Sequence, residues 1–135
     1  MENEKFYLDW SWINAMLDNL EKKVQRRSQP YTTLIGVPRG GLIVACLLAH
    51  RLNIKDVKTI ESVKTIDSNS LIVEDIIDSG KTIANMKFDS RVDVASLIVR
   101  HSAKVMPKYH SVKLNNDLWV VFPWENEVST LRIIE

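Results

Sequence analysis

Apolar side chains recur at the spacing of a helix near the start of the chain. They are Trp12, Ile13, Met16, Leu17, Leu20 and Val24. Charged residues occupy the other side of the same segment, which predicts an amphipathic helix packed on a core, although such a stripe can also bind a partner protein. Asp9 can cap this helix, Pro30 marks its end, and we expect Trp10 to lie in the core beside it. A second, more uniformly apolar helix is predicted for 42–52.

Short apolar runs between turn-forming residues predict the strands. We expect a buried strand that begins at Leu71 and ends near Glu74, and others at 34–37, 57–60, 62–66, 92–99 and 109–114. The pieces at 57–60 and 62–66 suit the edge of a sheet. Strands that alternate with helices predict βαβ units, and therefore an α/β fold with a mainly parallel central sheet flanked by helices.

Composition limits the class of protein. The chain has 135 residues, 45% of them hydrophobic, which is enough for one compact domain spanning 1–135. Its 18 basic and 17 acidic side chains give a net charge of +1, with no sign of general nucleic-acid affinity. Cys46 is the only cysteine, which excludes a disulfide framework or a multi-thiolate metal site within one chain. The single cysteine favours a reducing compartment, so we expect a cytoplasmic protein. The sequence also shows no signal-peptide layout and no apolar run of membrane-spanning length.

Three carboxylates follow the buried strand. Glu74 and Asp75 stand where the strand would end, and Asp78 opens the sequence Asp-Ser-Gly-Lys-Thr at 78–82, after which a helix can continue. A turn of this kind between a strand and a helix offers unpaired N–H donors and partial positive charge. The segment therefore predicts a phosphate-binding site.

A second strand-to-helix turn carries Arg39, Gly40 and Gly41. Glycines allow a ligand to approach the backbone, and an arginine can fork onto phosphate oxygens. Taken alone, the segment fits an ordinary loop with a solvated arginine equally well. However, this turn, the acidic cluster and Arg100 all follow predicted strands. Since α/β proteins bind ligands at the carboxyl edge of a parallel sheet, we expect these residues to converge on one site.

Gly80, Lys81 and Thr82 also match the end of the nucleotide-binding P-loop, G-x-x-x-x-G-K-[ST]. That motif needs a glycine five residues before Gly80, where Asp75 stands. Carboxylates at Asp75 and Asp78 would also repel the phosphates of a nucleotide. The P-loop interpretation is therefore excluded.

The stretch 71–82 resembles the signature of the type I phosphoribosyltransferases, in which an acidic pair at a strand end precedes Asp-Ser-Gly-x-Thr. Residues 36–42 resemble the pyrophosphate loop of this family. Residues 118–125 look like the purine-binding tail of its bacterial xanthine-guanine (6-oxopurine) members. The three motifs agree in order and spacing over a core of roughly residues 10–125, with a base-binding segment at 115–125.

The resemblance implies an Mg²⁺-dependent glycosyltransferase of purine salvage. Such an enzyme transfers the phosphoribosyl group of phosphoribosyl pyrophosphate (PRPP) to guanine, xanthine or hypoxanthine, and releases pyrophosphate and a purine nucleotide. Arg39, Gly40 and Gly41 would hold the pyrophosphate, in a loop where this family often has a cis peptide bond. Glu74 and Asp75 would bind the ribose hydroxyls and Mg²⁺.

The same resemblance assigns the 5′-phosphate of PRPP to the residues that follow the acidic pair. The phosphate would be bound by Ser79, Gly80, Lys81 and Thr82, with Lys81 acting chiefly through its backbone N–H. Asp78 would face N7 of the purine as the general acid/base.

For the base, the resemblance implies that Trp119 stacks on the purine and that backbone groups near Trp119 and Val120 read its 2-position. The family's lysine at the purine 6-oxo group aligns with Arg100, and Lys104 is the second candidate. Trp124 is expected in the core, at the border of the base site.

The segment 61–70 departs from the family, whose members carry a long flexible loop there that closes over PRPP. Such a lid keeps water from the reacting centre. Because the segment 61–70 is short, it favours an alternative, in which the chain is a non-catalytic PRPP- or nucleotide-binding regulatory module on the same fold. Asp78 and the aromatic tail favour the enzyme, and a purely structural interaction domain leaves the motifs unexplained. The resemblance also implies a homodimer or homotetramer, with no nucleic-acid or membrane partner.

Overall fold

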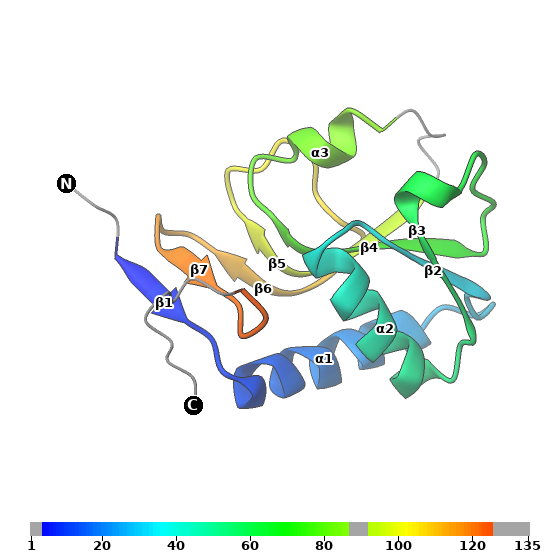
Figure 1. Ribbon diagram of the computed structural model, residues 1–135, viewed down its shortest axis with the longest axis horizontal. Helices are drawn as coiled ribbons and strands as arrows, with labels where there is room; N and C mark the ends of the chain where they lie inside the picture. Colours follow the sequence, from blue (N-terminus) through cyan, green and yellow to red (C-terminus); the bar gives the residue numbers. More distant parts are fainter. Residues whose placement is uncertain (1–3, 87–91, 126–135) are drawn as a thin grey trace, which may run out of the picture.

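The computed structural model describes residues 4–86 and 92–125 (Figure 1). Its elements in chain order are β1 (Lys5–Tyr7), α1 (Trp10–Gln25), β2 (Thr33–Gly36), α2 (Gly40–Leu52), β3 (Asp56–Thr59), the 3₁₀ turn η1 (Ile60–Ser62), β4 (Ser70–Ile77), α3 (Lys81–Ala84), β5 (Asp93–Arg100), β6 (Tyr109–Leu114) and β7 (Trp119–Val121). Residues 1–3, 87–91 and 126–135 lie outside the described part of the chain. No helix in the described ranges is long and apolar enough to cross a membrane.

The central sheet has five strands in the order β3-β2-β4-β5-β6, and every neighbouring pair is parallel. The chain places β3 on one side of β2 and then crosses to place β4 on the other side. This reversal makes a topological switch point between β2 and β4, where α/β folds bind their ligands. Gly36, the last residue of β2, pairs there with Val73 of β4. The loops that follow both strands therefore share one edge of the sheet.

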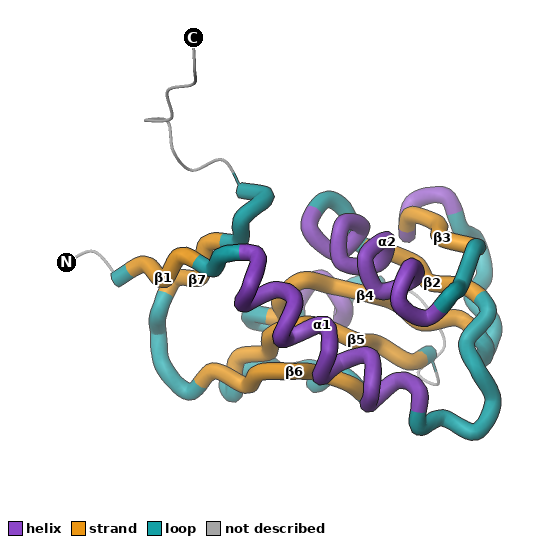
Figure 2. Tube along the Cα trace, turned by 90° about the horizontal axis from the view of Figure 1, so that it is seen from below, coloured by secondary structure: helices purple, strands orange, loops and turns teal. Residues whose placement is uncertain are grey.

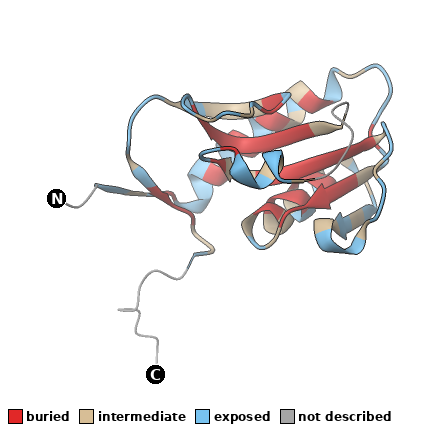
Figure 3. Ribbon diagram, turned by 90° about the horizontal axis from the view of Figure 1, so that it is seen from above, coloured by how far each residue is buried: buried red, intermediate tan, exposed pale blue. Residues whose placement is uncertain are grey.

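Both faces of the sheet are covered, as the continuous apolar runs predict. Leu34, Leu71 and Val73 belong to a core cluster that includes the apolar faces of α1 and α2. Ile35 and Ile72 belong to a second cluster on the opposite face, which α3 and neighbouring loops cover. Figures 1 and 2 show α1 and α2 on one side of the sheet, and Figure 3 shows the buried strands from the side of α3.

The first predicted helix is confirmed, but its two tryptophans are not core residues. Asp9 caps α1 by accepting the Trp12 N–H at 2.9 Å. The side chains of Trp10 and Trp12 are exposed, so the prediction that they are buried is wrong. Each lies beside the apolar stripe rather than at its centre, since successive helical positions are about 100° apart. The buried stripe consists of Ile13, Met16, Leu17, Leu20 and Val24.

Three features of the strands differ from the prediction. The strand that begins at Leu71 was expected to end near Glu74, but β4 continues to Ile77, so that Glu74 and Asp75 lie within it. The segment 62–66 is not a strand, because β3 ends at Thr59 and η1 follows, with the Ser62 hydroxyl donating to the Thr59 carbonyl at 2.9 Å. Such a side-chain hydrogen bond offers the backbone an alternative to pairing in a sheet. The sequence did not predict β1, which pairs in parallel with β7 and sets Lys5 beside Trp119. This two-stranded sheet fixes the position of the predicted base-binding segment.

Candidate active site

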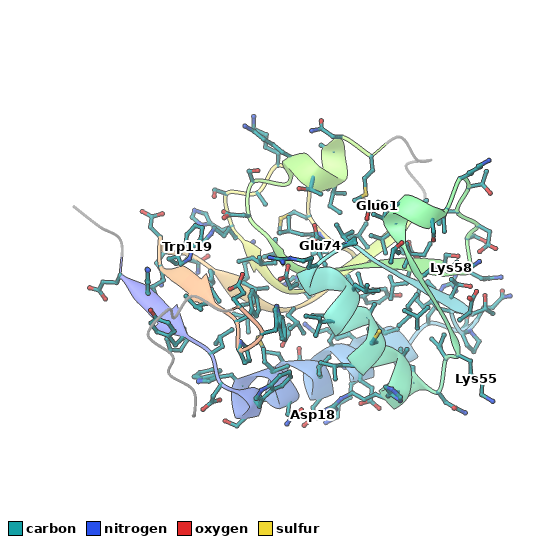
Figure 4. The ribbon with its side chains drawn as sticks, in the orientation of Figure 1. Asp18, Lys55, Lys58, Glu61, Glu74 and Trp119 are labelled. Carbon is teal, nitrogen blue, oxygen red and sulfur yellow. The ribbon has the colours of Figure 1, made fainter. Side chains whose placement is uncertain are left out.

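A cavity of about 660 Å³ opens at the switch point between β2 and β4. Its wall contains Arg39 and Gly40 from the start of α2, Glu74 and Asp75 from β4, and Trp119 from β7. Figure 4 shows Glu74 near the N-terminal end of α2 and Trp119 on β7. The structure thus brings together residues of all three sequence motifs, which lie far apart along the chain.

Two glycines allow the start of α2 to lie directly against the end of β4. A Cβ on Gly40 would lie 1.8 Å from Oδ2 of Asp75. A Cβ on Gly41 would lie 2.5 Å from the carbonyl oxygen of Val73. Since real Cβ atoms do not approach other atoms so closely, both positions require glycine for this packing.

Arg39 gives one corner of the cavity a positive charge. It is the N-cap residue of α2, and the peptide bond between Pro38 and Arg39 is cis, as the resemblance implied. The N-terminal end of a helix carries partial positive charge and unpaired N–H groups, to which the guanidinium adds a full charge. This corner therefore suits an anion such as a pyrophosphate.

Glu74 and Asp75 form a partly buried acidic pair. The Glu74 residue is only 8% exposed. Burial, together with the charge of Asp75, raises the pKa of Glu74 to about 8. Burial also raises the pKa of Asp75, although the Ile76 N–H, 2.8 Å from Oδ1 of Asp75, counters part of this effect. Neighbouring carboxyl groups that resist ionisation become easier to ionise when a cation binds to them.

The donor set at this pair fits Mg²⁺ that binds together with a phosphate ligand. No three His, Cys, Asp or Glu side chains within residues 4–86 and 92–125 form a group that could hold a metal ion by themselves. Mg²⁺ commonly binds through one or two carboxylates, with waters and substrate phosphates completing its shell. Glu74 and Asp75 provide that number of carboxylates beside the cavity.

The loop at 78–82 surrounds a small hollow of about 90 Å³. Gly80 has a φ of 87°, a left-handed conformation that favours glycine, and a Cβ there would lie 2.8 Å from the backbone nitrogen of Val105. The Lys104 N–H donates to the Ser79 carbonyl at 2.9 Å. The segment after β5 therefore holds the shape of this loop.

Two details of the loop differ from what the motif implies. The Lys81 N–H, expected to bind phosphate, donates instead to the Ser79 hydroxyl at 3.2 Å. A bound phosphate would have to displace that hydroxyl or bind alongside it. In addition, α3 has only four residues, so its dipole would contribute little to phosphate binding. The individual N–H groups and hydroxyls of the turn remain as donors to a phosphate.

Asp78 and Arg100 form an ion pair, with Nε of Arg100 2.8 Å from Oδ1 of Asp78. Nη1 of Arg100 donates to the Asn116 carbonyl at 3.1 Å, and Nη2 donates to the Leu118 carbonyl at 2.7 Å. Arg100 is 9% exposed, whereas the Asp78 side chain is 57% exposed. Arg100 therefore connects the loop after β4 to the segment before β7, and its side chain is not part of the cavity wall.

Trp119 is the exposed aromatic side chain of the cavity, with 49% of its surface accessible, whereas Val120 packs into the core. The Trp119 N–H donates to the Glu4 carbonyl, and the Val121 carbonyl accepts from the Leu8 N–H, both at 2.9 Å. Successive residues of a strand direct their backbone groups to opposite edges. The N–H and carbonyl of Val120 therefore face away from β1, where they are available to a base.

The cavity wall also contains residues that were not predicted as site residues, namely Val37, Pro38, Ile43, Trp124 and Glu125. The Trp124 ring stacks on Phe122 with centroids 4.9 Å apart, and the Phe122 N–H donates to Oε1 of Glu125 at 2.8 Å. The buried Nε1 of Trp124 lies near Gly40 and Asp75 and has no partner within hydrogen-bond geometry among the described residues. Trp124 and Glu125 lie inside the predicted base-binding segment 115–125, and this place is the signal that could have identified them.

Lys104, the second candidate for the 6-oxo group, also lies outside the cavity wall. Its side chain is exposed, and its backbone contacts the loop at 78–82 through Ser79. This position is closer to the predicted phosphate site than to the predicted base site.

Comparison with known proteins identifies the family. No family model matches the sequence. A purine phosphoribosyltransferase from Pyrococcus horikoshii has the same fold, with a TM-score of 0.72 and 30% sequence identity, over 98% of this chain and 99% of that one. The chain belongs to the purine phosphoribosyltransferase family. The type I fold and the resemblance indicated by the three motifs are confirmed.

Other relatives agree with this assignment. The xanthine-guanine phosphoribosyltransferase of Cereibacter sphaeroides is 27% identical over 89% of this chain and 86% of its own length. The protein of the same name from Nitratidesulfovibrio vulgaris is 26% identical over 91% of this chain and 86% of its own length. The xanthine-guanine-hypoxanthine phosphoribosyltransferase of Helicobacter pylori shares the fold with a TM-score of 0.73 at 23% identity, covering 91% of this chain and 95% of that one.

Proposed function

We propose that this chain is an Mg²⁺-dependent phosphoribosyltransferase of purine salvage that transfers the phosphoribosyl group of PRPP to guanine, xanthine or hypoxanthine. The observation that carries the proposal is one cavity lined by a guanidinium, a carboxylate pair and an exposed tryptophan. These groups suit the three parts of the reaction, namely pyrophosphate, ribose with its metal ion, and base. The names of the curated relatives support a 6-oxopurine as the acceptor.

The pyrophosphate would bind at Arg39 and the N-terminal end of α2. Negative charge develops on the pyrophosphate as its bond to the ribose breaks, and positive groups already in place stabilise that charge. Glu74 and Asp75 would hold the ribose hydroxyls and Mg²⁺. When bound, Mg²⁺ would neutralise charge on PRPP and help to orient it. Attack by the base from the face opposite the pyrophosphate would invert the anomeric carbon through an oxocarbenium-like transition state.

Asp78 would manage the proton at N7 of the purine, while the loop at 78–82 binds the 5′-phosphate. Because Arg100 holds Oδ1 of Asp78 at 2.8 Å, the other carboxylate oxygen is left to face a ligand. A positioned general acid or base typically contributes about 10²–10⁴-fold to a reaction rate.

The base would stack on the exposed face of Trp119, beside the backbone groups of Val120. Stacking on an aromatic ring accepts any purine, so a choice among purines must come from hydrogen bonds at the edge of the base. The Val120 N–H and carbonyl would supply such bonds at the 2-position, where guanine, xanthine and hypoxanthine differ.

The test is nucleotide formation from PRPP and Mg²⁺ with guanine, xanthine and hypoxanthine in separate reactions, and with adenine as the control base. Chromatography separates the product nucleotide from the base. Nucleotide formed from one or more of the 6-oxopurines, and lost when Mg²⁺ is chelated, supports the proposal. No nucleotide from any base, in a protein that still binds PRPP, contradicts the enzyme and supports the regulatory module that the short segment at 61–70 suggests.

A further inference from the structure

The side chain of Arg100 makes polar contacts with three different residues. Its Nε is paired with Asp78, and its two terminal nitrogens donate to the carbonyls of Asn116 and Leu118. A guanidinium has five N–H donors in a planar fork, so these contacts use the donors on three sides of the group. The side chain is buried, which makes every one of these contacts costly to break.

The three acceptors belong to the two parts of the predicted site that act on the base. Asp78 is the predicted proton-transfer group. Asn116 and Leu118 form the segment that leads directly into Trp119, and the Asn116 side chain closes this segment by accepting the Leu118 N–H at 3.1 Å. Arg100 thus joins the Asp78 loop to the β6–β7 connection through direct polar contacts.

We propose that Arg100 is a positioning residue that fixes Asp78 and the Trp119 segment relative to each other, and that it does not contact the base. This inference rests on the proposed function, and it assigns a different role from the one that the sequence resemblance implied. Arg100 acts by holding one oxygen of Asp78 and by holding the backbone that carries Trp119 and Val120.

A direct contact between Arg100 and the base would need a rearrangement of the site. The guanidinium is buried and does not line the cavity, so to reach the base it would have to move away from Asp78 or from the two carbonyls. Such a move would free the proton-transfer group or the base platform at the moment when both are needed. Its absence from the cavity wall agrees with the positioning role. The 6-position of the base would then be read by a group other than Arg100.

Two substitutions of Arg100 distinguish the effect of its charge from the effect of its three hydrogen bonds. Arg100→Met keeps an apolar stem and removes every donor. Arg100→Lys keeps the charge, but a single ammonium cannot span an acceptor on the loop after β4 and two carbonyls of the β6–β7 connection. Arg51→Met is the matched control, because Arg51 is also a partly buried arginine paired with carboxylates, Asp18 and Glu21, and it lies outside the cavity.

The kinetic test compares these variants with wild type and places each in an Asp78→Asn background. We expect Arg100→Met to lower kcat and to raise the KM for the base at least tenfold, with the KM for PRPP within about twofold. In the Asp78→Asn background, the same substitution should leave kcat unchanged and still raise the KM for the base. Arg100→Lys should keep more of kcat than Arg100→Met while losing the same base affinity, and Arg51→Met should match wild type.

A measurement without ligand distinguishes failure of the proposed transferase function from failure of the positioning role of Arg100. Hydrogen exchange of the backbone amides at 78–82 and 116–119 should accelerate in both segments in Arg100→Met, while exchange in β4 and β5 stays as in wild type. If the wild-type chain lacks transferase activity but exchange accelerates in both segments, the proposed function fails and the positioning role of Arg100 stands. Unchanged exchange in either segment, or kcat losses that simply add to those of Asp78→Asn, would overturn the positioning role.

Discussion

Gly40 packs so closely against Asp75 that a Cβ at position 40 would lie 1.8 Å from Oδ2 of Asp75. The contact sets the pyrophosphate loop directly against the acidic strand end. It also makes the two motifs depend on each other, since neither can be moved without displacing a group that the other uses.

Gly40→Ala should therefore impair the site more than the fold. The colliding atom belongs to a side chain that can turn away, and alanine is otherwise the better residue in a helix. We expect PRPP binding in the presence of Mg²⁺ to weaken about 10- to 100-fold, because Asp75 loses its position, with little change in melting temperature. Calorimetric titration and thermal unfolding measure the two effects. Unchanged PRPP affinity would contradict the role of Asp75.

Gly41→Ala, one residue later, should instead lower the stability of the fold. Its Cβ would lie 2.5 Å from the Val73 carbonyl, a backbone atom of a central strand that cannot turn away. We expect a loss of about 1–3 kcal/mol of unfolding free energy, as for other overpacked interiors. Urea denaturation monitors this loss, and a variant as stable as wild type would show that α2 is not held against β4 as described.

Glu74 should make the ligand-free protein less stable as the pH rises. Its pKa is raised from an ordinary 4.5 to about 8, so the folded state holds the proton more tightly than the unfolded chain. The stabilisation is complete below pH 4.5 and is lost as the pH rises through 8, with a slope of up to about 1.4 kcal/mol per pH unit.

Glu74→Gln tests this dependence, because glutamine resembles the protonated carboxyl and does not titrate. The variant should be more stable than wild type at pH 8 without Mg²⁺ and PRPP, and the difference between the two should shrink toward pH 5. Thermal unfolding across this range provides the comparison. A difference that does not change with pH would contradict the raised pKa.

Tyr31 should contribute to stability and not to activity. Its hydroxyl donates to the Asp93 carboxylate and lies 2.9 Å from the Tyr109 hydroxyl, at the ends of β5 and β6 opposite the cavity. Tyr31→Phe removes a hydrogen bond from each partner and leaves the Asp93 carboxylate, among the described residues, with only the longer contact to Lys108 at 3.4 Å. This should cost about 1–3 kcal/mol of unfolding free energy while kcat stays at the wild-type value. Tyr7→Phe, at an exposed tyrosine, is the control and should change neither quantity.

The sheet and the acidic strand end could be predicted from the sequence because their signals are local. The apolar run from Leu71 favours a strand buried on both faces, and this strand is present as β4. Its end was placed too early, because Glu74 and Asp75 lie within β4, which continues to Ile77, but they still lie near the carboxyl edge of the sheet. By contrast, β1 is only three residues long and owes its strand conformation to pairing with β7 at the other end of the chain. No local pattern records such a partner.

The role of Arg100 could not be predicted for a related reason. Its alignment with the family's lysine concerns one position, whereas its contacts depend on the path of the backbone at Asn116 and Leu118. Trp124 was not predicted as a site residue because an aromatic residue after a strand is usually a core residue, and nothing in the local pattern singled out Glu125. The cavity wall shows that these two also border the acidic pair.

The most direct test of the account is the rate of nucleotide formation by Asp78→Asn relative to wild type, with PRPP binding measured on the same preparations. Asparagine keeps the shape of the side chain and an oxygen for Arg100, but it cannot take up a proton. We predict that turnover falls about 10²–10⁴-fold while PRPP affinity stays within about threefold. An Asp78→Asn protein that forms nucleotide at the wild-type rate would contradict the assignment of Asp78, and with it the mechanism proposed for this site.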